Sequence, residues 1–108
     1  MQTQKIRQRL EHAEHTIAQL SELCMSQHGV PDALKQSVEQ LDEQARQCHA
    51  RLENTQDTQA LVQAVDQLEA ASDRAKMACQ SAGKIDHSVH AAVMRTHDEL
   101  SRLKHHLH

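Results

Sequence analysis

The sequence predicts an all-α protein, an antiparallel up-down-up-down four-helix bundle built from two similar helical hairpins. Gln, Ala, Glu, Leu, Lys and Arg are abundant, and these are strong helix formers, whereas runs of β-branched residues are missing. Only two glycines and one proline occur in 108 residues, so the chain has few places to turn. Apolar residues recur at alternating spacings of three and four along four long segments, the heptad pattern of packed helices.

The first helix is expected from about Thr3 to about Gln27, with Thr3 as an N-cap whose hydroxyl accepts a free backbone N–H. Gly29 suits the left-handed conformation that ends many helices. The second helix is expected to begin near Pro31, and Asp32 then places a negative charge at the positive end of the helix dipole. The apolar seams of these helices are Ile6, Leu10, Ala13, Ile17, Leu20 and Cys24, followed by Leu34, Val38, Leu41, Ala45, Cys48 and Leu52.

A polar segment, Asn54–Asp57, is expected to end the second helix. Leu61 follows Leu52 by nine residues, so the heptad phase changes within this segment. The alternative is a single long helix that runs through the segment and makes an elongated three-helix structure. The phase change argues against that alternative.

The third helix is expected at about 58–82, and the fourth from about Asp86 to the end, with a turn near Gly83 between them. Each seam position lies 55 residues after its counterpart in the first two helices. This similarity favours one domain, residues 1–108, made of two copies of a hairpin at about 3–54 and about 58–108. The later seams are Leu61, Val65, Leu68, Ser72, Ala75 and Cys79, followed by Val89, Val93, Thr96, Leu100, Leu103 and Leu107.

Antiparallel pairing of these seams predicts six layers of four residues. In one layer, the small pair Ala13 and Ala45 faces the large pair Leu68 and Leu100, which keeps the layer's volume suitable for a packed core. Ser72 and Thr96 share another layer, where their hydroxyls are expected to bond each other or an upstream carbonyl. The seam is narrow, which favours dimerisation through further apolar positions, namely Leu23, Val62, Ala71 and Ala78.

Charge and composition exclude several classes of function. Twelve Lys and Arg alternate with fifteen Asp and Glu, and no aromatic residue is present to stack on bases, so a nucleic-acid partner is not expected. No apolar run is long enough to span a membrane, and the first residues lack the apolar core of a signal peptide. Three cysteines do not suggest a disulfide framework. A cytoplasmic protein is therefore expected.

Ten histidines and three cysteines raise the question of a metal site. Cys24 and Cys79 fall in the layer nearest the two turns, and they are expected to be free thiols because the diagonal of a bundle is too long for a disulfide. His28 lies one turn beyond Cys24, and His87 begins the fourth helix. These four residues form a candidate Cys2His2 cluster for zinc or cuprous ion. The competing interpretation is that the thiols fill the core and the imidazoles face solvent.

No motif indicates an enzyme, because the chain has neither a glycine-rich phosphate loop nor the Glu-x-x-His pattern of di-iron bundles. We therefore expect a protein-interaction or structural module that binds a protein partner or its own copy, with no resident cofactor. The alternative is a metal-binding or metal-sensing bundle. A DNA-binding regulator is a third reading, which the scattered positive charge opposes.

Overall fold

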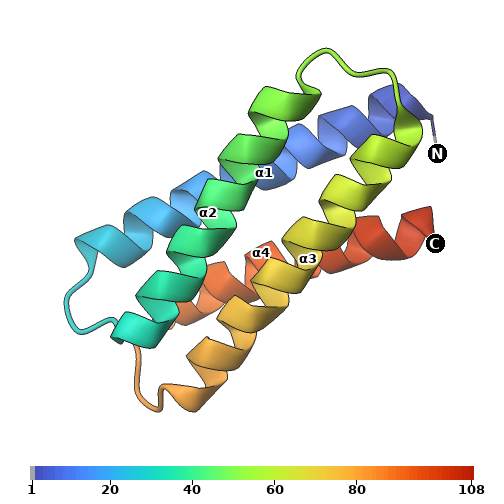
Figure 1. Ribbon diagram of the computed structural model, residues 1–108. Coiled ribbons are helices and arrows are strands. Elements are labelled where there is room, and N and C mark those ends of the chain that lie inside the picture. The colour runs from blue at the N-terminus through green and yellow to red at the C-terminus, as the bar shows by residue number, and fades with distance from the viewer. Residues whose placement is uncertain (1) are drawn as a thin grey trace.

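The computed structural model describes residues 2–108, which form four α-helices and no strand. The helices are α1 (Thr3–Ser26), α2 (Asp32–Leu52), α3 (Thr58–Ser81) and α4 (His87–Leu107). Successive helices run in opposite directions, and the two ends of the chain lie at the same end of the bundle (Figure 1). The predicted fold class is confirmed, and every helix end lies within two residues of its predicted position. We call α1 with α2 hairpin 1, and α3 with α4 hairpin 2.

Both hairpin turns use a glycine in the left-handed region, as predicted. Gly29 has a φ of 80° and Gly83 has a φ of 77°. A side chain is strained in this conformation, which is why glycine favours it. Val30 in the first turn is buried, and Ile85 in the second packs partly against the core, so each turn also closes its end of the bundle with an apolar residue.

The polar segment between the hairpins breaks the helix, as the phase change predicts. α2 ends at Leu52 and α3 begins at Thr58, so one long helix is excluded. The guanidinium of Arg7 fastens this connection to α1. It donates to the carbonyl oxygens of Leu52 at 2.8 Å and Glu53 at 2.9 Å, and also to that of Thr55. These bonds satisfy carbonyls that the end of α2 leaves without an intrahelical donor.

The helix starts differ from the prediction at α1. Thr3 is the first helical residue and not the N-cap, which is Gln2 and makes no side-chain capping bond. The Thr3 hydroxyl instead bonds the hydroxyl of Thr58 at the start of α3. The contact between α1 and α3 thus uses the Thr3 hydroxyl, which would otherwise be free to cap α1.

Two aspartates cap the helices of hairpin 2. Asp57 accepts a bond from the backbone N–H of Gln59 at 3.0 Å, and Asp86 accepts one from Ser88 at 2.8 Å. The bonds from Ser88 to the Asp86 carboxylate hold the pKa of Asp86 below its ordinary value. Hairpin 1 has no such caps, because Gln2 and Pro31 occupy the corresponding positions without a side-chain bond.

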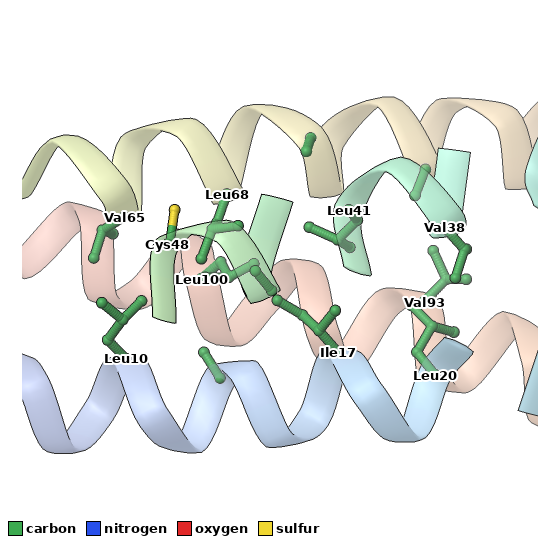
Figure 2. Close-up of a cluster of buried hydrophobic side chains, with 14 of the residues drawn as sticks. Leu10, Ile17, Leu20, Val38, Leu41, Cys48, Val65, Leu68, Val93 and Leu100 are labelled. Atoms are coloured by element: carbon green, nitrogen blue, oxygen red, sulfur yellow. The ribbon is translucent and has the colours of Figure 1, made fainter. Parts of the chain in front are cut away.

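The predicted seams form a continuous core between the four helices. Every seam residue is buried except Leu107, which is partly buried against the core. Figure 2 shows the layering, with Leu20, Val38 and Val93 at one level and Leu68 beside Leu100 at another. The hydroxyl protons of the two polar seam residues go to upstream carbonyls, from Ser72 to Glu69 at 2.7 Å and from Thr96 to Ala92 at 2.8 Å.

The two hairpins correspond residue by residue. All eight helix ends obey the offset of 55, since α3 and α4 begin and end 55 residues after α1 and α2. The contact between Thr3 and Thr58 joins equivalent residues at one end of the bundle. At the other end the Cys24 and Cys79 thiols lie close enough for Cys79 to raise the pKa of Cys24. Positions 55 residues apart therefore have matching places in the helices of the two hairpins, with α1 matched to α3 and α2 to α4, and we call this match the twofold correspondence.

The bundle is a rhombus in cross-section, with α1 and α3 on the short diagonal. These two helices contact each other, whereas α2 and α4 do not meet within the described part of the chain. Residues beside the seam are buried as well, including Thr16 and Ser21 on α1 and Ala64 and Ala71 on α3. Burial of Ala71 contradicts its predicted place on a dimer surface, because a residue that is 1% exposed has no surface to offer a partner.

Candidate functional site

A groove lies between α1 and α4, and we call it the α1/α4 groove. Its volume is about 810 Å³. Its lining residues repeat at helical spacings on the facing sides of the two helices, which is why residues far apart in sequence share one groove. They are Gln8, Arg9 and His12 of α1 with Ala91, Met94, Arg95, Asp98, Glu99 and Arg102 of α4.

A polar cluster joins the two helices within this groove. Glu99 contacts Nδ1 of His12 through one carboxylate oxygen. Its other oxygen lies 2.9 Å from the hydroxyl of Thr16, whose single proton is shared with the carbonyl oxygen of His12 at 3.1 Å. Thr16 is buried, and its hydrogen bond to Glu99 joins two helices, so the cluster is suited to holding α4 against α1. The negative charge of Glu99 is therefore engaged by His12 and Thr16 of the protein itself.

Three arginines of the groove are left without a partner. Arg9 is half-buried, and Arg95 and Arg102 are exposed. None of them forms an ion pair within residues 2–108. Asp98 supplies one further carboxylate, so the groove has an excess of positive charge. The half-buried Met94 and the small Ala91 add an apolar part to the lining.

The opposite side of the bundle is formed by α2 and α3, and we call it the α2/α3 face. The twofold correspondence exchanges it with the α1/α4 groove, yet its chemistry differs. Arg95 and Arg102 correspond to Gln40 and Gln47, and Met94 corresponds to Glu39. A hollow of about 510 Å³ on α2 is lined entirely by Gln and Glu, namely Gln36, Glu39, Gln40, Glu43, Gln44 and Gln47. One side of the bundle is therefore basic and the other is polar and acidic.

A second groove, of about 400 Å³, lies between α1 and α2, and apart from Glu11 its carboxylates are paired. His49 lies 3.2 Å from Glu14, and Arg46 lies 3.0 Å from Asp42. Burial raises the pKa of Glu14, and His49 opposes this effect. A groove whose charges already satisfy one another offers less to a charged partner than the α1/α4 groove does.

The predicted metal ligands occupy the turn end of the bundle, but they differ in exposure. Cys24 and Cys79 are both 2% exposed, whereas His28 and His87 are exposed on the turn and on the first residue of α4. Within residues 2–108, no three Cys, His, Asp or Glu side chains are grouped so that they could hold a metal ion. Zinc titration of the reduced protein, with Cys24→Ser and Cys79→Ser as comparisons, tests the metal hypothesis directly.

The three cysteines are free and buried thiols. Burial raises the pKa of each, since the apolar surroundings disfavour the thiolate. The thiolate is the form that attacks disulfides and binds metals. These cysteines therefore have the character of small core residues, and Cys48 lies in the core beside Val65 and Leu68 (Figure 2).

Sequence reasoning did not predict the cluster of arginines in the α1/α4 groove, because it treated the basic residues as scattered. The seven-residue spacing of Arg95 and Arg102 was a visible signal, since it places both on one side of a helix. Arg9 is 86 residues away from Arg95, and only the register of α1 against α4 brings the three together.

Comparisons with protein families, with functionally characterised proteins and with solved structures find no match to this chain. Within residues 2–108 no helix combines the length and the apolarity that a membrane crossing requires.

Proposed function

We propose that the protein is a protein-interaction module that binds an acidic segment of a partner through the α1/α4 groove. The observation that carries this proposal is the set of three unpaired guanidinium groups around Met94. Arginine and methionine are enriched in protein interfaces, where arginine bonds carboxylates in pairs and methionine adapts to the partner's shape.

A helical partner segment fits the shape of the groove. The groove runs between two antiparallel helices, and grooves of this kind bind amphipathic helices through side chains three and four positions apart. Carboxylates on such a segment would meet Arg95 and Arg102, and its apolar side chains would meet Met94. Nucleic acid is a weaker candidate, since the chain has no aromatic residue to stack on bases.

Binding, rather than catalysis, is the function that these residues favour. The hydroxyl of Thr16 donates its proton, and the carboxylate of Glu99 is engaged by Thr16 and His12. Glu99 accepts the hydrogen bond of Thr16, but a catalytic nucleophile must also reach its substrate, and Thr16 is buried between the helices. We also place the protein in a reducing compartment such as the cytoplasm, where free thiols persist.

The test uses a synthetic amphipathic helix that carries glutamate at every fourth position, with a fluorescent label. We expect it to bind the wild-type protein, and a copy with lysine in place of glutamate not to bind. The double variant Arg95→Glu/Arg102→Glu should weaken binding at least about tenfold. Arg74→Glu makes a charge change of the same kind on the α2/α3 face and should leave peptide binding unchanged. Equal binding by the double variant and the wild type would refute the proposal.

A further inference from the structure

We propose that the α1/α4 groove of one copy of this chain binds the α2/α3 face of a second copy. This inference rests on the proposed function, for which it names the partner. Three features of the structure support it: the opposite charges of the two surfaces, their positions on opposite sides of the bundle, and an unmet hydrogen-bond acceptor on the α2/α3 face.

The charges of the two surfaces are complementary. Glu39 and Glu43 lie one helical turn apart on the exposed side of α2. Neither carboxylate is in an ion pair within the described part of the chain, although Gln47 donates a hydrogen bond to Glu43 at 3.2 Å. The α1/α4 groove therefore has an excess of guanidinium groups, with three arginines to two carboxylates, and the α2/α3 face has an excess of carboxylates, with two glutamates to Arg74. Their contact would pair both sets.

A glutamine on the α2/α3 face adds an unmet hydrogen-bond acceptor to the charge complementarity of the two surfaces. Gln44 and Gln47 line a hollow of about 380 Å³ on the α2/α3 face, together with Gln67, Ala70 and Arg74. The Oε1 atom of Gln44 is buried and has no hydrogen-bond donor within residues 2–108. An unpaired buried acceptor is costly, and an arginine has five N–H donors. A guanidinium that enters this hollow from a second copy would supply that donor when the buried Gln44 amide turns toward the hollow.

The positions of the surfaces determine the kind of assembly. In Figure 1, α2 and α3 lie in front and α1 and α4 lie behind, so the two surfaces point in opposite directions. A contact between two different surfaces on opposite sides leaves one of each free at the ends of the assembly. Such an assembly grows as an open series and does not close as a dimer. Because the surfaces are polar, the contact should also be weak and sensitive to salt.

The twofold correspondence explains why one chain has both surfaces. Arg9 corresponds to Ala64, which is fully buried against the neighbouring helices. Arg95 and Arg102 correspond to the uncharged Gln40 and Gln47. Related positions thus have basic side chains on one side of the bundle and neutral or acidic ones on the other, and this difference makes the surfaces complementary instead of self-repelling.

The test is sedimentation velocity of the full chain over a range of protein concentrations. We expect the average mass to rise with concentration as a continuous series at about 0.05 M salt and to fall back to the monomer at about 0.5 M salt. Variant 1, Arg95→Glu/Arg102→Glu, and variant 2, Glu39→Arg/Glu43→Arg, should each be monomeric, since each presents two surfaces of like charge. Lys84→Glu changes one charge in the second turn and should associate as the wild type does.

Mixing the two variants gives the decisive result. An equal mixture brings the reversed groove of variant 1 against the reversed face of variant 2, and the unchanged surfaces also match, so association should return. Circular dichroism of each variant checks that the helices are intact. A wild-type chain that is monomeric at every concentration, or a mixture that stays monomeric, would overturn the inference. The acidic peptide would still bind the groove in that case if the proposed function is correct, which separates the two failures.

Discussion

Hairpin 1 and hairpin 2 have helices of equal length that are held in place by different interactions. α1 and α3 each have 24 residues, and α2 and α4 each have 21. Hairpin 2 caps both of its helices with aspartate, whereas hairpin 1 has no side-chain cap and instead uses Arg7 to bond the end of α2. Because the helices have equal lengths although their caps differ, we infer that the apolar seam determines helix length. The interactions at the helix ends then add stability without changing that length.

The largest expected difference between the hairpins lies in the layer that Leu68 and Leu100 are predicted to share with Ala13 and Ala45. Leu68 is 0% exposed and Ala13 is 1% exposed. We expect Leu68→Ala to lower the free energy of unfolding by about 2–5 kcal/mol, because neighbouring alanines cannot fill the cavity. The corresponding change in hairpin 1, Ala13→Leu, should cost about 1–3 kcal/mol through overpacking. Urea denaturation measures both, and an unchanged midpoint for Leu68→Ala would contradict this layer.

The next effect concerns Arg7, whose counterpart in hairpin 2 is the half-buried Val62. Arg7→Ala removes the donor for the carbonyls of Leu52 and Glu53 and should lower the free energy of unfolding by about 1–3 kcal/mol. Hydrogen exchange of the amides in residues 53–57 should also become faster. Arg9→Ala is the matched control, since Arg9 lies two residues further along α1, lines the α1/α4 groove and forms no ion pair within residues 2–108. Equal losses in both variants would show that the bonds of Arg7 are not the cause.

The caps give a smaller effect. Asp57→Ala removes an acceptor for the N–H of Gln59 and should cost about 1 kcal/mol of unfolding free energy. Gln2 is the corresponding residue of hairpin 1 and makes no capping bond, so Gln2→Ala should change stability by less than about 0.5 kcal/mol. Thermal unfolding of the two variants at neutral pH makes the comparison. A loss of similar size in both would mean that the Asp57 bond contributes nothing of its own.

The smallest effect depends on pH. Glu14 and His49 correspond to Glu69 and Lys104, which lie 3.7 Å apart. Burial holds the folded pKa of Glu14 above its ordinary value of 4.5, so its ionised form is unfavourable in the folded protein. Its stability cost is present above the folded pKa, decreases as the pH falls through it, and is absent below the unfolded value.

Glu14→Gln should therefore raise the melting temperature at pH 7 and have no effect near pH 3, with a gain of less than about 1 kcal/mol. Glu69→Gln breaks an ion pair with a lysine and should not stabilise the protein at pH 7. Melting curves from pH 3 to pH 7 test this contrast. A lower melting temperature for Glu14→Gln at pH 7 would show that the contact with His49 outweighs the cost of burial.

The fold could be predicted from the sequence because the apolar residues recur with a regular helical period. The seam positions repeat so regularly that they identify the buried side of each helix, and the change of phase after Leu52 places the break between the hairpins. Thr3 shows what periodicity misses, since its hydroxyl bonds Thr58 across the bundle instead of capping α1. The same limit applies to the α1/α4 groove, where Arg9 and Arg95 come together only through packing. Residues that depend on another helix for their surroundings cannot be assigned from one helix alone.

The complementary layer also determines which hairpins can pair. Two copies of hairpin 1 would bring four alanines to the level of Ala13 and Ala45 and leave a void. Two copies of hairpin 2 would crowd four leucines at the level of Leu68 and Leu100. Each hairpin should therefore pack poorly against a copy of itself and well against the other hairpin. If two chains exchanged hairpins, hairpin 1 of one chain would still pack against hairpin 2 of the other. The predicted match of side-chain volumes therefore favours the pairing of hairpin 1 with hairpin 2 over the pairing of either hairpin with a copy of itself.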